Sequence, residues 1–411
     1  MTTPKTTSLS EKLLAEESET TNSLLGPPRL PPEIISLVFE SLAVSKDWST
    51  LRTCGVLSSA QLHSARKYLF STVSISLITQ VNVVTFKDIA RRIQGLTTLL
   101  RRDPETSKYV TNLVLLDSFP VYDSDWITQH PCLPTFLHLL PNVQSFTFGC
   151  AVGYLSWALI SSDLRIALTS LCKNPHLRTL TFCSLGNVPI NLFDSAVRYL
   201  TLTNTLVSKA IVGDFQPSDN QFQLRYLAFR SSSLTHTESA WNLMQNCAAT
   251  LKYLKWRCWE DPVAQASTLP GPIDLGKLTS LKKLSVRLSF GRHGYDLRGF
   301  HTLLQNTTEP MPLRILDISI SFPLHFQPHK DRDILQHSSW VDFPDVLKRK
   351  EYRELKKVKM EFVINRYAGR TASNEGDPVL MFKKAIMRSL VKLRNASSFH
   401  FKLSIRTFNA S

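Results

Sequence analysis

The sequence predicts an α/β fold in which a short leucine-rich strand unit repeats to form an irregular solenoid. Three observations predict it. The unit apolar-x-x-apolar-x-apolar recurs in about ten degenerate copies between residues 110 and 405. A stricter form, in which Arg or Lys follows the first residue, occurs as LRTLTF, LRYLAF, LKYLKW, LKKLSV, LRILDI and LKKVKM, whereas composition alone would produce roughly one copy. Segments with helical spacing of apolar residues lie between several units.

The alternation of side chains along a strand explains the unit. Its second and third apolar positions are two residues apart, so they share a face and point into the core. The Arg or Lys beside the first apolar residue faces away, as does the residue between the two inward positions. The copies are Val110/Leu113/Leu115, Val143/Phe146/Phe148, Leu177/Leu180/Phe182, Val197/Leu200/Leu202, Leu224/Leu227/Phe229, Leu251/Leu254/Trp256, Leu281/Leu284/Val286, Leu313/Leu316/Ile318, Leu355/Val358/Met360 and the degenerate Ala396/Phe399/Phe401.

The strands are expected to be parallel, with helices or loops on the other side, because a single strand unit cannot bury its own apolar face. Helical candidates are residues 237–249, 300–304 and 379–393. Residues 325–345 and 366–377 are rich in Pro, His, Gly and charge, so we expect insertions at one rim, where binding residues are often found. An ordinary α/β domain with coincidental strands is the alternative. The lack of Gly-x-Gly-x-x-Gly turns and of long doubly wound helices disfavours it.

Composition favours a globular, intracellular protein. Hydrophobic residues make up 43% of the 411 residues and charged residues 20%, which is atypical of disorder. The sequence has no apolar stretch of membrane-spanning length, and its start lacks the pattern of a secretory signal. The seven cysteines are scattered without a C-x-x-C pair, which favours reduced thiols. We therefore expect a cytoplasmic or nuclear location and no membrane partner.

No motif predicts catalysis, a cofactor or a metal site. Residues 271–278 match G-x-x-x-x-G-K, but Leu278 stands where a phosphate loop needs Ser or Thr. His325 and His329 flank Pro328 without an acidic ligand motif. The sequence has no G-x-S-x-G. We expect a binding protein rather than an enzyme.

The net charge is +15 at pH 7, and much of it is spread through the repeats. Such a balance suits an anionic partner. The one dense block lies between residues 348 and 359, and a solvated face is its simplest interpretation. Nucleic acid is not the partner we expect, although a nucleic-acid surface at this block stays an alternative. Its basic residues are Lys348, Arg349, Lys350, Arg353, Lys356, Lys357 and Lys359.

A helical segment precedes the repeat. Residues 1–28 are expected to form a disordered tail that ends in prolines, and Pro31 and Pro32 can open a helix. A polar turn at 45–49 and helical stretches at 50–57 and 59–69 follow. Within the first helix, apolar residues recur at helical spacing: Ile34, Ile35, Val38, Phe39 and Leu42.

This segment resembles the F-box. The opening Leu-Pro-x-Glu and the apolar positions after it are matched by Leu30, Pro31, Glu33, Ile34, Ile35, Val38, Phe39 and Leu42. The continuation LRTCGVLSSAQLHSARKYLFSTVSI is similar to the F-box-like proteins of mushroom-forming fungi (basidiomycetes), with Ala60 and Gln61 where those carry Trp. The resemblance is specific over roughly residues 29–75. It divides the chain into a tail (1–28), an F-box-like segment (29–75) and a leucine-rich-repeat-like solenoid (76–411).

The resemblance implies a substrate-recognition adaptor of a Skp–cullin–F-box ubiquitin ligase. The F-box would dock the Skp adaptor, and through it a cullin, while the repeats hold an unknown protein substrate. Two alternatives stay open: a leucine-rich-repeat scaffold with no ligase role, and a basic nucleic-acid-binding protein. The residues implied in docking the Skp adaptor are Leu30, Pro31, Ile35, Val38, Phe39 and Leu42.

Overall fold

The chain divides into two compact units, Met1–Ser71 and Thr72–Ser411, called unit 1 and unit 2 below and described separately. The computed structural model describes residues 31–57, 59–76, 86–117, 125–151, 153–193, 196–208, 222–231, 234–258, 273–289, 298–322, 338–367 and, in part, 384–410. The division falls after Ser71 rather than after residue 75, because the next residues form a strand that belongs to the sheet of unit 2.

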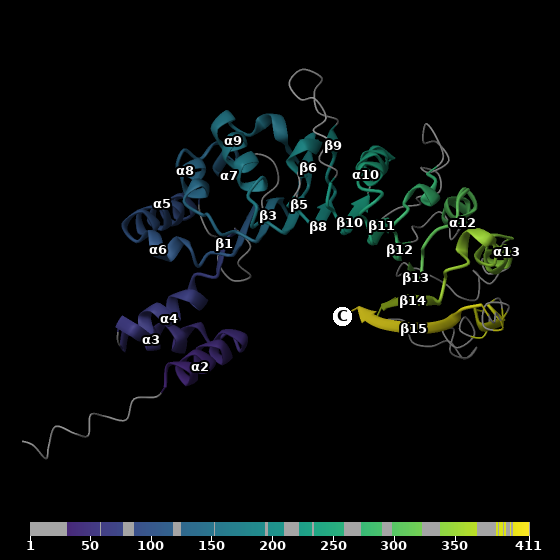
Figure 1. The fold of residues 1–411 in the computed structure, drawn as a ribbon, viewed down its shortest axis with the longest axis horizontal. Coiled ribbons are helices and arrows are strands. Elements are labelled where there is room, and N and C mark those ends of the chain that lie inside the picture. The colour runs from purple at the N-terminus through teal and green to yellow at the C-terminus, as the bar shows by residue number, and fades with distance from the viewer. Residues whose placement is uncertain are drawn as a thin grey trace, which may run out of the picture. The chain divides into compact units, whose positions relative to one another are not determined.

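The described part of unit 1 consists of helices α2 (Pro32–Val44), α3 (Trp48–Leu57) and α4 (Ser59–Leu69) (Figure 1). They lie where the sequence predicts three helical stretches. Pro32 occupies the first turn of α2, where its missing N–H and fixed φ cost nothing. Each helix contributes one residue to a small buried core: Phe39, Leu51 and Ala65.

The turn between α2 and α3 is held by a side-chain cap. Lys46 adopts a positive φ of 60°, and the carboxylate of Asp47 then accepts hydrogen bonds from the hydroxyl of Thr50 (2.7 Å) and its backbone N–H (3.1 Å). The hydroxyl bond and then the backbone bond lower the pKa of Asp47. The cap satisfies an N–H at the start of α3 that has no partner within the helix.

Unit 2 is built on one eleven-stranded parallel sheet in the described part of the chain, which confirms the expected α/β class. Two pairs of short strands, β4 (Leu155–Ser156) with β6 (Leu185–Gly186) and β7 (Val188–Pro189) with β9 (Val207–Ser208), lie outside it. The strands of the large sheet, in spatial order, are β1 (Thr72–Ser76), β2 (Asn112–Asp117), β3 (Ser145–Cys150), β5 (Thr179–Cys183), β8 (Tyr199–Thr203), β10 (Tyr226–Ser231), β11 (Tyr253–Cys258), β12 (Lys283–Ser289), β13 (Ile315–Phe322), β14 (Lys357–Tyr367) and β15 (His400–Ala410).

The repeat positions of the sequence lie in register across this sheet. The second apolar residue of each of the first nine copies is opposite its counterpart in the neighbouring strand, and all nine are fully buried. Burying one such side chain contributes about 2 kcal/mol relative to leaving it in water. The row comprises Leu113, Phe146, Leu180, Leu200, Leu227, Leu254, Leu284, Leu316 and Val358.

The last copy was misplaced by two residues. Phe401 lies opposite Val358, and Leu403 lies opposite Met360, so the inward pair is Phe401 and Leu403 rather than Phe399 and Phe401. The structure also adds a strand before the first copy. Val73 and Ile75 of β1 extend the two inward rows.

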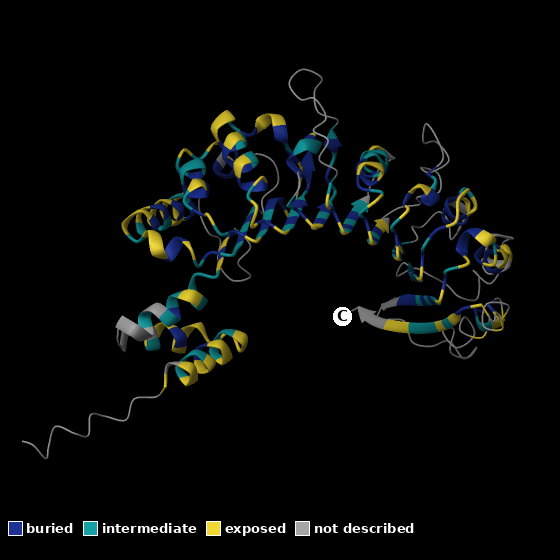
Figure 2. Cartoon of the chain, viewed as in Figure 1, coloured by how far each residue is buried: buried dark blue, intermediate teal, exposed yellow. Residues whose placement is uncertain are grey.

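Helices and short 3-10 turns cover one face of the sheet in unit 2, and the other face carries none in the described part (Figure 1). Buried and half-buried residues alternate along strands such as β2 and β13 (Figure 2). Two of the expected helices occur, as α10 (Leu234–Asn246) and α12 (Arg298–Gln305), while the third candidate (379–393) lies largely outside the described residues. The other α-helices are α5 (Phe86–Arg102), α6 (Pro104–Ser107), α7 (Asp125–Gln129), α8 (Cys132–His138), α9 (Ser162–Cys172) and α13 (Ser338–Leu347).

Part of the expected insertion at 325–345 is helical. The helix α13 occupies its second half despite the internal Pro344. Phe343 of α13 is fully buried, and its ring centroid lies 6.0 Å from that of Phe300 in α12. This apolar contact gives the segment a place in the core. Residues 323–337 and 368–383, which include His325 and His329, lie outside the described residues.

Candidate functional site

The helix α2 of unit 1 is apolar on two sides. Ile35, Phe39 and Leu42 face the unit 1 core. Ile34 and Val38, one turn apart, are exposed at 43% and 45%. A contiguous exposed apolar surface often marks a site of protein–protein contact, so α2 offers an apolar surface to a second molecule.

The residues that the sequence assigns to docking differ in how far the structure buries them. Phe39 is only 3% exposed and serves as core, so it does not belong to the exposed surface expected of it. Ile35 and Leu42 are half-buried against the same core. Pro31 and Val38 are exposed, and Leu30 lies outside the described residues.

The surface gains residues that sequence reasoning missed. Leu37 is 60% exposed, and Val44 and Trp48 are also exposed. The helical spacing of Ile34, Leu37 and Val38 was a usable signal, because residues three and four apart share a helix face. We call Ile34, Leu37 and Val38 the outer stripe of α2.

The dense basic block does not form one patch. Lys348 pairs with Asp345 at 3.3 Å, and Lys359 lies 3.8 Å from Asp317 on the neighbouring strand. Arg349 has a structural role, described next. Lys350 and Arg353 are exposed in the turn before β14. Lys356 directly precedes β14, and Lys357 is its first residue.

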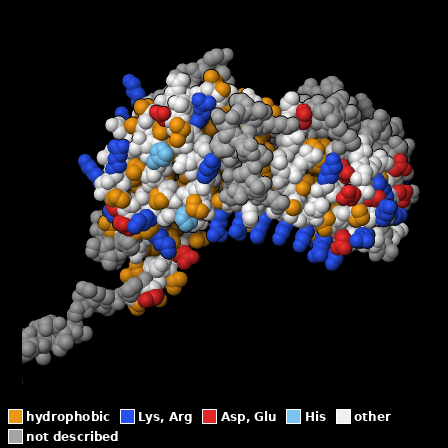
Figure 3. Space-filling model, turned by 45° about the horizontal axis from the view of Figure 1, so that its top comes forward, with side chains coloured by type: hydrophobic (Ala, Val, Ile, Leu, Met, Phe, Trp, Pro, Cys, Tyr) orange, Lys and Arg blue, Asp and Glu red, His pale blue; other side chains and the backbone are white. Residues whose placement is uncertain are grey.

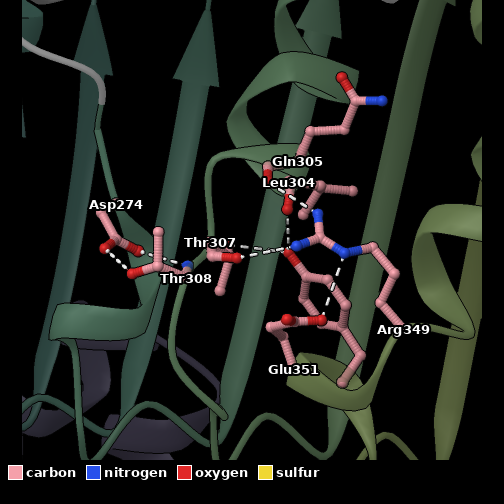
Figure 4. A network of polar contacts seen from close by, with 8 residues as sticks. Asp274, Leu304, Gln305, Thr307, Thr308, Arg349 and Glu351 are labelled. Atoms are coloured by element: carbon pink, nitrogen blue, oxygen red, sulfur yellow. Dashed lines mark hydrogen bonds and ion pairs between the residues drawn. The ribbon is translucent and has the colours of Figure 1, made fainter.

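Arg349 and Tyr352 tie the end of α12 to the turn η5 (Lys350–Tyr352) (Figure 4). Arg349 donates to the carbonyls of Gln305 (2.7 Å) and Thr307 (3.2 Å) and pairs with Glu351 at 3.2 Å. The buried Tyr352 hydroxyl donates to the Leu304 carbonyl at 2.7 Å. Leu304 and Gln305 are the last residues of α12, where helix carbonyls lack partners further along the helix, so the network ties the end of α12 to the segment before β14.

The segment that matches a phosphate loop is part of a structural turn. The carboxylate of Asp274 accepts a hydrogen bond from the hydroxyl of Thr308 at 2.7 Å (Figure 4). It also accepts one from the backbone N–H of Gly276 at 2.9 Å. Leu275–Lys277 forms a 3-10 turn, η3, and Leu278 is buried. An acidic side chain therefore uses the N–H that a phosphate would need.

The helix-free face of unit 2 carries an aromatic row. The rings of Tyr199, Tyr226 and Tyr253 lie in adjacent strands, with centroids 6.1 and 4.8 Å apart. The ammonium of Lys283, in the next strand, lies 4.7 Å from the centre of the Tyr253 ring. The rings pack on one another rather than presenting open faces, except that Tyr199 is 48% exposed.

The same face carries a cluster of basic residues. Arg230, Arg257 and Arg287 are opposite one another in β10, β11 and β12. Partial burial, followed by the charges of Arg257, Arg287 and Lys283, lowers the pKa of Lys255. Because β8, β10, β11 and β12 contain no acidic residue, this part of the face is suited to a negatively charged partner.

No family model matches the chain, and no curated protein is significantly similar to it. Within the described residues, no group of three or more His, Cys, Asp or Glu side chains is placed to hold a metal ion. In that same part of the chain, no helix is both long and apolar enough to span a bilayer.

Proposed function

We propose that this protein is a substrate-recognition adaptor of a Skp–cullin–F-box ubiquitin ligase. Unit 1 acts as the F-box and docks the Skp adaptor, which brings the cullin. Unit 2 acts as an irregular leucine-rich-repeat solenoid and binds a protein substrate. The chain performs no chemistry itself and works in the cytoplasm or nucleus, where Skp adaptors operate.

The two-sided apolar character of α2 carries this proposal. One stripe is used by the core of unit 1, and the outer stripe is exposed to solvent. Leaving such a stripe in water costs roughly 25 cal/mol of free energy per Å² of apolar surface. A docked apolar partner removes that cost. The match of Pro31, Glu33 and Ile34 to the F-box opening supports the Skp adaptor as that partner.

The proposal is tested by a pull-down with purified Skp adaptor. We expect the full chain to retain the adaptor and the Leu37→Glu and Val38→Glu variants to lose at least tenfold in affinity, because a carboxylate on the outer stripe must be desolvated on docking. Circular dichroism checks that each variant is folded.

Matched controls are provided by unit 2. Leu159 and Ile166 are 66% and 64% exposed, so Leu159→Glu and Ile166→Glu make the same chemical change in a different unit of the chain, and both should retain the adaptor. A folded wild-type chain that fails to bind would favour the scaffold alternative, in which unit 1 is only a terminal cap.

A further inference from the structure

Seven consecutive strands of unit 2 are each preceded by an exposed basic residue. They precede β5, β8, β10, β11, β12, β13 and β14, which are neighbours in the sheet. Basic side chains follow one another along the lower edge of the molecule in Figure 3. We call these seven residues the cation row: Arg178, Arg198, Arg225, Lys252, Lys282, Arg314 and Lys356.

Backbone hydrogen bonds fix the row. The N–H of each member from Arg198 onward donates to the carbonyl of the member before it, at 2.8–2.9 Å. Neighbouring strands are about 4.8 Å apart, so six intervals give a line of charge roughly 29 Å long. The spacing of the row is set by the backbone of the sheet and does not depend on how the side chains are oriented.

Within the described residues, the cation row has no acidic partner. No carboxylate in the described part of the chain pairs with any of the seven. The fold keeps these seven positive charges in one line although they repel one another. A bound polyanion relieves that repulsion.

Tyrosines follow three members of the row directly: Tyr199, Tyr226 and Tyr253. Their hydroxyl groups can donate hydrogen bonds to phosphate oxygens. The basic cluster around Lys255 lies on the same face, a few residues further along the strands. The row is therefore the edge of a broader basic and aromatic surface.

We propose that the cation row binds single-stranded nucleic acid through its phosphodiester backbone, without reading the bases. The row is a line of like charges at regular spacing, and it has the length of several strand spacings, so it suits a polymer with regularly repeated charge. Recognition of a single phosphorylated side chain uses a local Arg cluster instead, and a duplex presents two backbones rather than one. The mutual packing of the tyrosine rings leaves backbone contact as the main source of affinity.

Fluorescence anisotropy with a labelled 20-nucleotide oligouridine tests this inference. The logarithm of the association constant should fall with the logarithm of salt concentration at a slope of roughly −0.7 per phosphate neutralised. The variant Arg198→Gln/Arg225→Gln/Lys252→Gln/Lys282→Gln should lose at least tenfold in affinity at low salt, with a slope shallower by roughly 3. These side chains are exposed, so the fold should survive, which circular dichroism checks.

The matched control removes four exposed cations from α5. The variant Lys87→Gln/Arg92→Gln/Arg101→Gln/Arg102→Gln changes the net charge equally and should stay within about twofold of wild type. Equal losses of affinity in the two variants would show that binding depends only on net charge, which would overturn the inference. Absence of salt-sensitive binding by the folded wild-type chain would also overturn it.

A polyglutamate peptide of the same length and a duplex of the same charge complete the test. Weaker binding of both than of oligouridine supports the proposal. Equal or tighter binding of the peptide assigns the row to an acidic protein segment, and tighter binding of the duplex assigns it to double-stranded nucleic acid. Either result overturns the proposal. Binding of the Skp adaptor is measured separately, so the two functions can fail independently.

Discussion

The ammonium of Lys283 in β12 forms an ion pair of 3.1 Å with the carboxylate of Asp317 in β13. Although burial acts against the charged form, the hydrogen bond and charge of Asp317 raise the pKa of Lys283. The described acidic residues on the helix-free face, Asp317 and Glu361, lie in β13 and β14 and pair with neighbouring cations there. Carboxylates thus occur on this face in β13 and β14, whereas β8, β10, β11 and β12 contain none.

Removing one of these carboxylates should strengthen polyanion binding. In Asp317→Asn, the ammonium groups of Lys283 and Lys359 lose their acidic partner. Surface ion pairs are worth about 0.2–1 kcal/mol, so we expect affinity for oligouridine to rise about two- to fivefold. Anisotropy at low salt measures the change. Unchanged affinity would show that the helix-free face does not contribute to binding, and a weaker complex would contradict the electrostatic account.

Gly149 and Gly95 should respond oppositely to alanine. Gly149 has φ of +134°, and an added Cβ would collide with the backbone carbonyl of Cys183 in the neighbouring strand. We expect Gly149→Ala to lose on the order of 3 kcal/mol or more of unfolding free energy. Gly95 lies in α5 with open space around it, so Gly95→Ala should gain about 0.5–1 kcal/mol. Urea titration measures both, and a tolerated Gly149→Ala would contradict the described contact of β3 with β5.

The hydroxyl of Tyr352 should contribute measurably to stability. It donates to the Leu304 carbonyl and lies 2.9 Å from Oγ1 of Thr307. Tyr352→Phe leaves these buried groups without that partner, so we expect a loss of about 1–3 kcal/mol. Tyr199→Phe, at an exposed site, should change stability by less than about 0.5 kcal/mol. Equal effects of the two substitutions in urea titrations would argue against the network of Figure 4.

Alkaline pH should destabilise the protein through its buried thiols. Burial raises the pKa of Cys172 and of Cys247 from 9.0 to about 12. The unfolded chain then releases these protons at lower pH than the folded chain, so the unfolding free energy falls as pH rises from about 9 toward 12. Each thiol contributes a slope of about 1.4 kcal/mol per pH unit in that window.

The comparison with a variant isolates this effect from other titrating groups. Cys172→Ala/Cys247→Ala should lose stability less steeply than wild type between pH 9 and 10.5, whatever its stability at pH 7. Urea midpoints across that range measure the slope. Parallel curves for the two proteins would contradict the assigned burial.

The strands of unit 2 were predictable because inward residues alternate with outward ones. The register of the last copy was predicted wrongly for the same reason. Phe399, Phe401 and Leu403 all have the same parity, and a two-residue slip keeps every side chain on its face. Pairing with β14 over eleven positions resolves the register, and that information is not local.

Surface features were harder to predict than the core. Adjacent apolar residues such as Ile34 and Ile35 point to different sides of α2, and the sequence alone does not say which side is covered. The dense block at 348–359 drew attention because its charges are close in sequence. The cation row is assembled from residues about 20–42 positions apart, so only the parallel stacking of strands brings them together.

Titration calorimetry of purified Skp adaptor into the full chain tests the central claim most directly. We predict a one-to-one complex whose binding heat-capacity change is negative, since docking on the outer stripe of α2 buries apolar surface. The Leu37→Glu variant should show no binding at the same concentrations, and Ile166→Glu should bind as wild type. Absence of binding by the folded wild-type chain, or unchanged binding by folded Leu37→Glu, would contradict the account.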